Sequence, residues 1–439
     1  MRGYLPDEIM SGLITVYSGC GVYEERTVET FGEIIQYLTD TRRILYECPS
    51  EHIIKLLDKF GKSIIRDPSL SRVPGLPYLS LWLREENIRS LYLTNFGSIP
   101  ASGDIITISS RLGMFSVPRG IVCHWIAGNV PVLGIFSLVL ATLGKNASIL
   151  KIPPELGRTF NLLLKGLEET VLFVEGDEVT GSIIARSVAL VSFPSSNHQI
   201  SEAFSLAADC RVVYGSEEAV SAISRLPHQV HCESIMYGPK YSLAVFDQVS
   251  KCSADFPDLL EGLARDIVLF NQTACSSPHV VFCEKGGFGI RKVAELLKIA
   301  FERISGHLYH PLAEGTVIAV INTRAQYLLD VHKDILCSSD LKWTICMNDD
   351  LSLEEPVQGR CIFLKEVDDI NQVLDLITRK VQTVSLSVRD ELRRESFVQE
   401  LAYRGVDRVM TPGMMHEYTQ PWDGILGAER MVRWIAVRR

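Results

Sequence analysis

The stretch Asp266-Ile-Val-Leu-Phe-Asn-Gln-Thr-Ala-Cys-Ser-Ser-Pro-His-Val-Val-Phe282 decides how the chain is interpreted. It places a thiol, Cys275, between the end of a predicted helix and the apolar run 279–283, which is typical of a strand. Small residues beside Cys275 leave room for a carbonyl carbon to approach the sulfur, and nearby backbone N–H groups can receive a developing oxyanion. The alternative is a buried structural cysteine, the commoner role of a free thiol.

Length and composition limit the class of protein. The chain has 439 residues, enough for two or three domains with a large core. Its 46% hydrophobic and 22% charged residues are typical of a globular protein. The formal net charge of −9 argues against nucleic-acid binding as the main purpose, because phosphate attraction needs clustered Lys and Arg. The most apolar stretch, 120–150, is interrupted by His124, Pro131 and several glycines, which makes it a poor membrane span.

The cysteine pattern bears on compartment and metal binding. Eleven cysteines at irregular spacings do not suggest a disulfide framework, and no CxxC pair of a zinc ribbon is present, so we expect no metal site. The sequence begins Met-Arg-Gly-Tyr-Leu-Pro-Asp-Glu, without a basic segment followed by an apolar signal core, which argues against secretion. The expected compartment is the cytoplasm.

The first part of the chain is predicted to be helical. Residues 1–103 show apolar residues three and four apart at 31–45 and again at 52–65, with Ser50 as the expected N-cap of the second helix. Such a layer is expected to pack on the domain that follows. Two short alternating runs within 104–119 predict a hairpin, which needs support from another domain or subunit because isolated hairpins are marginal in water.

Two regions of strand–helix alternation follow, at 120–247 and 248–415, and each predicts a doubly wound α/β domain. The remaining residues, 416–439, form a C-terminal tail. The predicted elements are, in order, a strand at 120–126, a helix to about 143, a short strand ending at Lys151, a helix over 157–187, strand 188–193, helix 201–210, a strand from 211, a helix to 270, strand 279–283, helix 289–303, strand 316–321, helix 325–331, a strand–helix pair at 361–379, strand 383–388 and a last strand before a basic tail.

Polar residues stand where several strands of the first sheet end. Asn129 follows one strand, and its side-chain amide can donate to an oxyanion, although Asn in a Gly-Asn turn often serves the backbone alone. Lys151 ends the next strand, where a cation suits a ribose or phosphate; a solvated surface Lys is the alternative. Gly215 and Ser216 open a helix whose N-terminal N–H groups favour a pyrophosphate, a weak signal by itself.

Taken in order, these features resemble the aldehyde dehydrogenase superfamily and, within it, the LuxC-type acyl-CoA reductases. The resemblance runs from about residue 116 to 424. It implies two doubly wound α/β domains, one for cofactor and one catalytic, plus a small β oligomerisation element. The motifs that carry it are Gly128-Asn-Val-Pro131, Lys151-Ile-Pro-Pro, Tyr214-Gly-Ser216, Tyr237-Gly-Pro-Lys-Tyr-Ser242, Asn271-Gln-Thr-Ala-Cys-Ser-Ser-Pro278, Gly405-Val-Asp-Arg408 and Trp422-Asp-Gly424.

The resemblance also implies roles for single residues. Cys275 is the nucleophile and Asn129 the side-chain donor of the oxyanion hole. Lys151 contacts the adenosine ribose or its phosphate, and Gly215 and Ser216 lie by the dinucleotide. In ordinary aldehyde dehydrogenases a Glu-Leu-Gly-Gly-Lys motif supplies the base that activates hydrolytic water.

Departures from the superfamily pattern refine this prediction. The base position is occupied by Met236, although Glu233 is close enough in sequence to substitute. Without a base, exchange with another thiol is favoured over hydrolysis. The glutamate that holds the nicotinamide ribose is assigned to Glu355. Pro154 stands where NAD-preferring members often carry an acid, which favours NADPH, although Glu155 beside it weakens the argument and NADH stays possible.

The predicted function is NADPH-dependent reduction of an acyl thioester, on coenzyme A or an acyl or peptidyl carrier protein, to an aldehyde. An oxidative aldehyde dehydrogenase and a cofactor-free cysteine acyltransferase or acyl carrier are the alternatives. The resemblance also implies an acyl-transferring partner protein. It further implies a homodimer or higher homo-oligomer, joined through the hairpin at 104–119 and the tail at 416–439 as oligomerisation elements. Candidate proton donors, each with a structural role as the commoner alternative, are His124, His231, His279 and His416.

Overall fold

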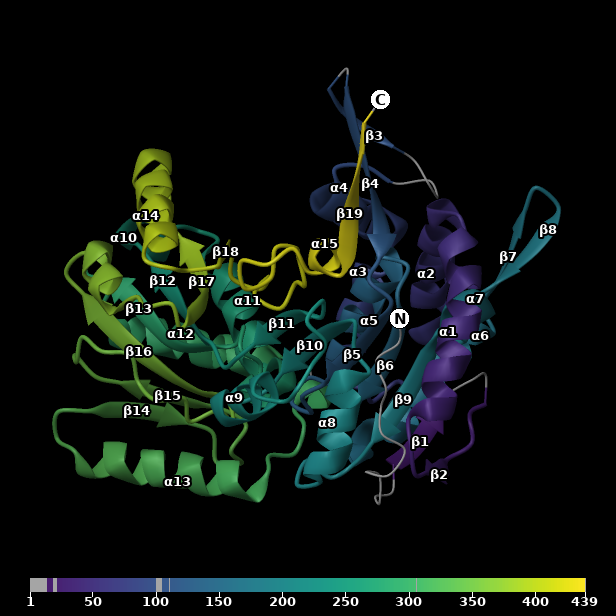
Figure 1. Cartoon of the computed structure of the whole chain (residues 1–439). Coiled ribbons are helices and arrows are strands. Elements are labelled where there is room, and N and C mark those ends of the chain that lie inside the picture. The colour runs from purple at the N-terminus through teal and green to yellow at the C-terminus, as the bar shows by residue number, and fades with distance from the viewer. Residues whose placement is uncertain (1–13, 19–21, 100–104, 110, 305, 439) are drawn as a thin grey trace. The chain divides into compact units, whose positions relative to one another are not determined.

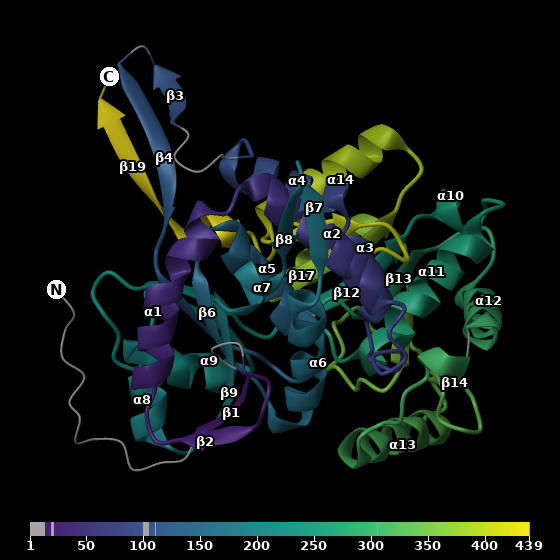
Figure 2. The same cartoon turned by 90° about the vertical axis from the view of Figure 1, so that its right-hand side faces the viewer.

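The computed structural model describes residues 14–18, 22–99, 105–109, 111–304 and 306–438 (Figures 1 and 2). The chain divides into two compact units: unit 1 is Met1–Gly238 with Tyr418–Arg439, and unit 2 is Pro239–Glu417. Among the helices that the described residues form, none combines the length and apolar character that crossing a bilayer requires.

A seven-stranded sheet forms the centre of unit 1, in the order β11-β10-β5-β6-β9-β1-β2. The five strands from β11 to β9 are parallel, whereas β1 pairs antiparallel with both β9 and β2. The strands are β1 (Ile14–Ser18), β2 (Arg26–Val28), β5 (Ile121–Trp125), β6 (Ala147–Lys151), β9 (Val188–Ser192), β10 (Cys210–Tyr214) and β11 (Glu233–Tyr237).

Helices cover both faces of this sheet, as expected of a parallel sheet. On one face, Trp125 of β5 lies against Phe204 of α8, with ring centroids 4.5 Å apart. On the other, His124 of the same strand contacts Ser137 of α5, Nδ1 to Oγ 2.7 Å. The helical elements of unit 1 are α1 (Gly32–Glu47), α2 (Ser50–Ile64), α3 (Leu76–Trp82), α4 (Glu85–Phe96), α5 (Leu133–Leu143), η1 (Pro154–Leu156), α6 (Gly157–Glu168), α7 (Ser182–Ala185), α8 (His198–Leu206), α9 (Glu217–Ser224) and α15 (Gly427–Arg430).

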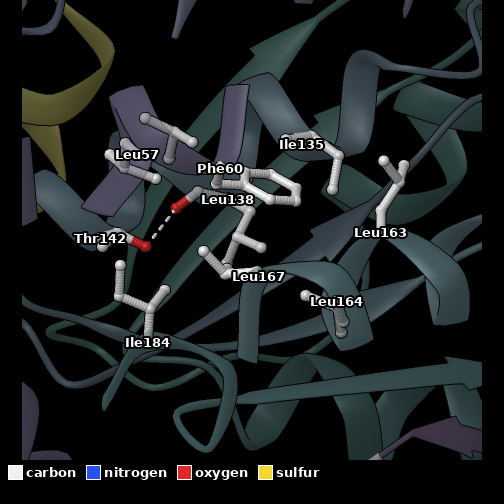
Figure 3. A pocket seen from close by; sticks show the side chains of 10 residues that line it. Leu57, Phe60, Ile135, Leu138, Thr142, Leu163, Leu164, Leu167 and Ile184 are labelled. Carbon is white, nitrogen blue, oxygen red and sulfur yellow. Dashed lines mark hydrogen bonds between the residues drawn. The ribbon is translucent and has the colours of Figure 1, made fainter. Parts of the chain in front are cut away.

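Apolar side chains from α2, α5 and α6 meet in the core of unit 1 (Figure 3). They leave a cavity of about 10 Å³, lined by residues such as Leu57, Leu138 and Leu163. Such a volume holds at most a single water molecule. The cavity is therefore a small packing gap and not a ligand site.

Two smaller sheets belong to unit 1. Strands β7 (Val171–Val174) and β8 (Asp177–Thr180) form a hairpin. Strand β4 (Leu112–Pro118) pairs antiparallel with both β3 (Ile106–Ser109) and β19 (Val432–Arg438). The start of β19 is anchored through α15, because Asn95 Oδ1 of α4 accepts hydrogen bonds from the N–H groups of Ala428 and Glu429.

Unit 2 is built around a second seven-stranded sheet, in the order β14-β15-β16-β13-β12-β17-β18. All its pairs are parallel except β14 with β15. Its strands are β12 (Tyr241–Phe246), β13 (Pro278–Glu284), β14 (Asp334–Cys337), β15 (Thr344–Met347), β16 (Cys361–Val367), β17 (Val381–Ser387) and β18 (Arg408–Met410). Its helical elements are α10 (Gln248–Lys251), α11 (Phe256–Val268), η2 (Leu269–Gln272), α12 (Ile290–Arg303), η3 (Gly306–Leu308), α13 (Glu314–Leu329), η4 (Ile370–Leu376) and α14 (Glu391–Tyr403).

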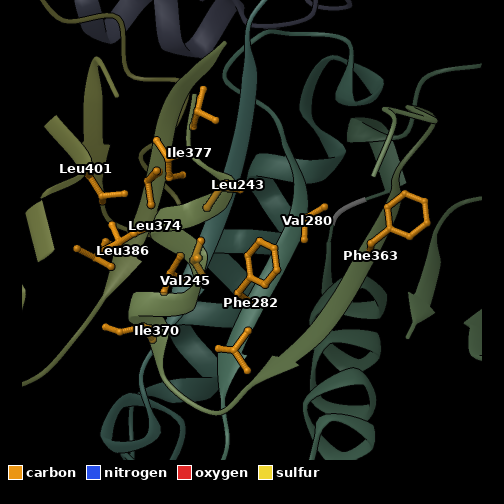
Figure 4. Close-up of a cluster of buried hydrophobic side chains, with 14 of the residues drawn as sticks. Leu243, Val245, Val280, Phe282, Phe363, Ile370, Leu374, Ile377, Leu386 and Leu401 are labelled. Atoms are coloured by element: carbon orange, nitrogen blue, oxygen red, sulfur yellow. The ribbon is translucent and has the colours of Figure 1, made fainter. Parts of the chain in front are cut away.

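The sheet of unit 2 separates two apolar cores. Leu243 and Val245 of β12 join the cluster shown in Figure 4, which includes side chains from η4 and α14. The alternate residues Ala244 and Phe246 enter a second cluster with α11 and α12. Both faces of the sheet are therefore buried, which explains why its central strands are almost continuously apolar.

Several predicted elements are confirmed. Helices α1 and α2 match the predictions at 31–45 and 52–65, and the hairpin predicted within 104–119 forms, although residues 104 and 110 lie outside the described residues. Strand β13 and helix α12 match the predictions that follow Cys275.

Three predictions are wrong. Ser50 is the first residue within α2, preceded by Pro49, and is not its N-cap. The helix predicted over 157–187 ends at Glu168, and residues 171–180 form the β7–β8 hairpin, whose turn residues Glu175 and Gly176 adopt positive φ. The β-branched run 316–321 lies in α13, where Val320 packs in the core of unit 2, so tertiary contacts override local strand propensity.

The boundary between the two units also differs from the sequence-based one. The sequence predicts a boundary after Asp247, which places β12 in the first domain. The observed division falls after Gly238. Strand β12 pairs with β13 and β17 at the centre of the second sheet, so its backbone hydrogen bonds fix it in unit 2.

Candidate active site

Cys275 lies in the loop between η2 and β13, as the sequence predicts. The chain reaches it through three successive residues with left-handed backbone, Phe270, Asn271 and Gln272, with φ of 56°, 53° and 64°. Such conformations are strained for residues other than glycine and persist where surrounding contacts fix them. A backbone held in this way suggests that the position of the loop is functionally constrained.

Side-chain hydrogen bonds hold this strained loop. The amide of buried Gln272 donates from Nε2 to the main-chain oxygens of Pro278 (2.7 Å) and Cys361 (3.0 Å), and its Oε1 accepts from the Cys361 N–H at 2.9 Å. Asn271 donates from Nδ2 to the oxygen of Pro311 at 2.9 Å. The loop is thus tied to β13 and β16, which gives Cys275 a defined position.

Cys275 is half-buried and is contacted from β12 and β17. Gln382 Nε2 lies 3.3 Å from Cys275 Sγ, within the range of an N–H···S hydrogen bond. Ser242 Oγ donates to the main-chain oxygen of Cys275 at 2.7 Å. Pro278 begins β13 directly after the loop. The sulfur therefore lies at the edge of the sheet where these parallel strands begin.

A buried polar cluster supports the residue after the nucleophile. Ser276 Oγ is 2.9 Å from His416 Nδ1, and His416 Nε2 is 2.7 Å from the main-chain oxygen of Asp266. Because a carbonyl oxygen can only accept, Nε2 carries the proton and Nδ1 accepts from the Ser276 hydroxyl. Burial lowers the pKa of His416 to about 4, so the ring is neutral at physiological pH.

Asp266 completes this cluster as a buried acid. Its Oδ2 accepts a hydrogen bond from the Gly413 N–H at 2.6 Å. Burial raises the pKa of the Asp266 carboxyl to about 8, because an ionised carboxylate is poorly solvated inside the unit. The cluster next to Cys275 is therefore uncharged near neutral pH.

The residues predicted to bind the cofactor lie along one edge of the sheet in unit 1. Lys151 ends β6, Asn129 follows β5, and Gly215 and Ser216 follow β10. Because these strands are parallel, all four residues lie at their carboxyl ends. The chain passes from β9 to β10 on the other side of β5, so the strand order reverses between β5 and β10. Such a reversal is where open α/β sheets bind ligands.

Lys151 is held in place by its neighbours. Its Nζ lies 3.1 Å from Ser195 Oγ and 5.0 Å from the centre of the Phe193 ring. Burial lowers the pKa of the Lys151 ammonium. A cation that is already desolvated gives up less hydration when it meets an anion.

Asn129 is exposed in the turn between β5 and α5. Gly128 before it approaches the ring of Pro153 so closely that a Cβ on the glycine would lie 3.2 Å from Pro153 Cγ. The turn therefore packs against the segment that follows Lys151. The Asn129 side chain is thus exposed at the carboxyl edge of the sheet.

The helix after β10 begins as predicted. Ser216 caps α9, because its Oγ accepts from the Ala219 N–H at 3.3 Å. A Cβ on Gly215 would lie 3.0 Å from Ala219 Cβ, so a small residue is favoured there. Glu217 and Glu218 lie in the first turn of α9, where their negative charges partly compensate the positive end of the helix dipole. The Gly-Ser turn alone does not predict this charge compensation.

Met236, which is predicted to stand at the base position, lies in β11. Met236 of β11 is half-buried and packs against the core of unit 1. Glu233 cannot substitute for the missing base, because it begins β11 at the amino end of the parallel strands. Its carboxylate is also engaged there, 3.1 Å from Arg119 Nη2 and 3.1 Å from Arg430 Nε.

Glu355 lies in the loop between β15 and β16 of unit 2 and is exposed. Its neighbour Glu354 is bound by buried Lys365 (Nζ to Oε1 2.8 Å) and by Asn348 (Nδ2 to Oε1 3.1 Å). Of the two adjacent carboxylates, Glu355 is therefore the one presented to solvent.

The four candidate histidines differ in their surroundings. His124 is buried, with its ring nitrogens on Ser137 and Ser148, and His231 is exposed, 3.2 Å from Asp209 Oδ1; both have structural contacts. His279 is buried beside Tyr241, and no hydrogen-bond partner for its Nδ1 is present among the described residues. His416 supports Ser276 as described above. None of the described residues forms a cluster of three or more His, Cys, Asp or Glu that could hold a metal ion.

Comparison with known proteins places these features in a family. The model of the acyl-CoA reductase (LuxC) family matches residues 114–434. A long-chain acyl-protein thioester reductase from Photorhabdus laumondii is 26% identical over 334 residues, which cover 73% of this chain and 64% of the relative. One from Vibrio harveyi is 22% identical over 328 residues, covering 73% and 65%. The chain thus spans less than two thirds of the length of these curated relatives.

Solved structures confirm the expected fold. An NADP-dependent enzyme of E. coli has a TM-score of 0.70 at 13% identity, covering 97% of this chain and 95% of its own. A glyceraldehyde-3-phosphate dehydrogenase from Methanocaldococcus jannaschii complexed with NADP has a TM-score of 0.67 at 12% identity, covering 93% of each chain. An aldehyde dehydrogenase from Brucella melitensis has a TM-score of 0.68 at 12% identity, covering 100% and 99%. At these identities the likeness shows the fold alone.

Proposed function

Because the chain belongs to the acyl-CoA reductase (LuxC) family, we propose that it reduces an acyl thioester to an aldehyde through an acyl intermediate on Cys275. The observation that carries this proposal is the half-buried Cys275 thiol in a loop fixed on both sides, with an amide nitrogen 3.3 Å from the sulfur. A thiol that is held, accessible and offered a hydrogen bond is suited to nucleophilic catalysis.

The reaction has two stages at Cys275. The thiolate attacks the thioester carbonyl, a C–S bond forms, and the carrier leaves as a thiol after taking up a proton. A reduced nicotinamide, when bound, supplies the hydride that converts the acyl-cysteine into a thiohemiacetal. The C–S bond then breaks, its electrons return to sulfur, and the aldehyde leaves. The sum is an acyl thioester, NADPH and a proton giving an aldehyde, a free thiol and NADP⁺.

Both stages place negative charge on the carbonyl oxygen. The proposed donors to this oxyanion are the Asn129 side-chain amide and the Cys275 backbone N–H. Asn129 suits this role because it is exposed at the carboxyl edge of a parallel sheet. Each such donor is typically worth about 3 kcal/mol of barrier.

The residues of unit 1 fit a nicotinamide dinucleotide. The reversal of strand order between β5 and β10 provides the crevice, Gly215 and Ser216 begin α9 beside it, and Lys151 supplies a cation at the same edge. We propose NADPH, because Lys151 suits a 2′-phosphate and Pro154 removes an acidic side chain at the position predicted to oppose it. NADH is the alternative. Glu355 is the proposed contact to the nicotinamide ribose.

Met236 at the predicted base position disfavours hydrolysis of the acyl-enzyme. Without a carboxylate at this position, no group there activates water, so transfer from and to thiols competes well with hydrolysis. This observation favours a thioester reductase over the alternative of an oxidative aldehyde dehydrogenase. A comparison of acyl-CoA plus NADPH with aldehyde plus NADP⁺ separates the two directions.

The acyl donor is proposed by class. Coenzyme A and a carrier protein both present a thioester, and the relatives named long-chain acyl-protein thioester reductases favour a protein-bound long-chain acyl group. An acyl-transferring partner protein is proposed on the same ground. The β3–β4–β19 sheet, in which β3 and β19 are the edge strands among the described residues, is proposed to join subunits of a homodimer or higher homo-oligomer. The cytoplasm, which keeps thiols reduced, is the proposed compartment.

Intact-mass spectrometry tests the central claim. The protein is incubated with acyl-CoAs of several chain lengths without cofactor, and its mass should rise by a single acyl group that maps to Cys275. Addition of NADPH should restore the original mass and release the aldehyde. Cys275→Ala should form no adduct and reduce no thioester. Undiminished turnover by that variant would refute the covalent mechanism, and an adduct that NADPH leaves in place would favour the acyl-carrier alternative.

A further inference from the structure

Gln382 occupies an irregular position in the sheet of unit 2. Tyr241 and Ser242 of β12 pair with Val381 and Thr383 of β17, so Gln382 is an extra residue in a β-bulge. In a regular strand the side chains of Gln382 and Thr383 would point to opposite faces. Instead the Thr383 hydroxyl lies 3.3 Å from Gln382 Oε1. The bulge re-aims Gln382 so that its amide reaches Cys275.

A chain of hydrogen bonds leads from a buried cation to the sulfur. Arg408 Nη1 donates to Thr383 Oγ1 at 3.3 Å, and Thr383 Oγ1 donates to Gln382 Oε1 at 3.3 Å. Gln382 Nε2 then lies 3.3 Å from Cys275 Sγ. Because Thr383 accepts from Arg408, its own proton is directed to Gln382 Oε1, which keeps the amide nitrogen toward the sulfur.

The cation at the start of this chain is fixed. Arg408 is buried in β18, and its guanidinium also donates to the main-chain oxygens of Met415 (3.1 Å) and Glu417 (2.5 Å). An arginine guanidinium stays protonated in proteins, including when it is buried. The orientation of the whole chain is therefore set by a permanent charge.

We propose that Arg408, Thr383 and Gln382 act as positioning residues that hold Cys275 Sγ and stabilise it as a thiolate. The proposal rests on the function assigned to Cys275 above. A donor aimed at sulfur favours the anion before attack and again when the thiohemiacetal C–S bond breaks. Neither step changes the donor itself, so the same hydrogen bond serves both halves of the reaction.

Several titratable groups of unit 2 around the loop are uncharged near neutral pH. Burial lowers the pKa of His279 and of His416 to about 4, and raises the pKa of Asp266 to about 8. Burial also raises the pKa of Tyr241. Two guanidinium groups near the loop carry charge, Arg408 and Arg360, and Arg360 donates to the side-chain oxygen of Asn271. Of these two cations, Arg408 is the one whose hydrogen bonds lead to the Cys275 sulfur.

A matched pair of variants tests the proposal. Thr383→Val keeps the shape of the side chain but removes the hydroxyl, whereas Thr383→Ser keeps the hydroxyl. The full-length protein is alkylated with iodoacetamide at a series of pH values, and the Cys275 peptide is quantified by mass spectrometry. Thr383→Val should raise the pH midpoint of alkylation by roughly one unit and slow alkylation at pH 7 by roughly tenfold. Thr383→Ser should stay within about twofold of the wild type.

A second variant removes the group that contacts the Cys275 sulfur. Gln382→Met has similar volume and no donor, and should shift the Cys275 profile at least as far as Thr383→Val. Exposed Cys252 in the same samples is the internal control, and its alkylation should not change. In steady-state reduction of acyl-CoA, kcat should fall in both variants while KM for the acyl donor stays within about twofold.

The outcomes separate this inference from the proposed function. If Gln382→Met and Thr383→Val alkylate at Cys275 as the wild type does, while Cys275→Ala still forms no acyl adduct, the positioning role is refuted and the covalent mechanism stands. If Cys275→Ala forms the adduct, the proposed function fails. Should Thr383→Val unfold, shown by a lost thermal transition, Gln382→Met and Thr383→Ser decide the question.

Discussion

The hydroxyl of Ser242 donates a 2.7 Å hydrogen bond to the main-chain oxygen of Cys275. Ser242 lies in β12 where the pairing is irregular on both sides. The pairing with β17 skips Gln382, and the pairing with β13 skips His279. This bond fixes the peptide plane that follows the nucleophile. The strand that crosses the middle of the sheet thereby controls the orientation of the residue that carries the chemistry.

Loss of the Ser242 hydroxyl should impair acylation more than stability. We expect Ser242→Ala to lose about 1 kcal/mol of unfolding free energy, as for one buried hydrogen bond. Formation of the acyl-enzyme should slow by roughly tenfold, because a nucleophile displaced even slightly reacts poorly. Ser250→Ala is the matched control, since Ser250 Oγ donates to the Ser387 oxygen at 2.9 Å in the same unit. Equal acylation rates in the two variants would contradict the prediction.

Removal of the Asn129 amide should raise the activation barrier of acyl-CoA reduction. Asn129→Ala is expected to lower kcat for acyl-CoA reduction by roughly a hundredfold or more, as for one lost oxyanion donor. Alkylation of Cys275 by iodoacetamide should be unchanged, because that reaction forms no oxyanion. A kcat within a few fold of the wild type would show that Asn129 merely shapes its turn, the alternative that its Gly-Asn sequence leaves open.

The position of Cys275 could be predicted from the sequence because its signal is local. A helical pattern, small residues and an apolar strand follow one another in a short stretch, and α11 and β13 form on either side. The edge of the sheet that carries Lys151, Asn129 and Gly215 was predictable for the same reason, since parallel strands place their carboxyl ends together.

The contacts to the sulfur could not be predicted in the same way. Gln382 reaches Cys275 through a bulge, and bulges depend on the pairing of strands that are distant in sequence. The motif Gly405-Val-Asp-Arg408 does not indicate a role for Arg408, because its partner Thr383 is set by the pairing of β17 with β18. The polar residues Gln382 and Thr383 near the start of a buried strand were the available signal, since polar side chains are seldom buried without partners.

Neutralising Lys151 should reveal the cofactor preference. Lys151→Met keeps most of the stem but removes the charge, and KM for NADPH should rise by roughly tenfold or more, as for a lost ion pair to phosphate. KM for NADH should change less if the ammonium contacts the 2′-phosphate. Lys165→Met on the exposed face of α6 is the control and should change neither value. An equal rise for both cofactors would favour a contact to the ribose.

The buried carboxyl of Asp266 should make stability depend on pH. Burial raises the pKa of Asp266 from 3.8 to about 8 in the folded protein. Between these values the folded state retains a proton that the unfolded chain has released, so the free energy of unfolding falls as pH rises. Below the lower pKa both states are protonated, and above the upper one both are ionised, so the dependence flattens at each end.

Asp266→Asn removes this titration while an amide oxygen can still accept from the Gly413 N–H. The stability of the variant relative to the wild type should therefore increase steadily from pH 5 to pH 8, as measured by urea unfolding at each pH. Asp258→Asn, on the exposed face of the same helix, serves as the control and should follow the wild type. If the free energy of unfolding changes with pH in the same way for the wild type and Asp266→Asn, the Asp266 carboxyl is ionised in the folded protein. The polar cluster next to Cys275 would then carry a negative charge.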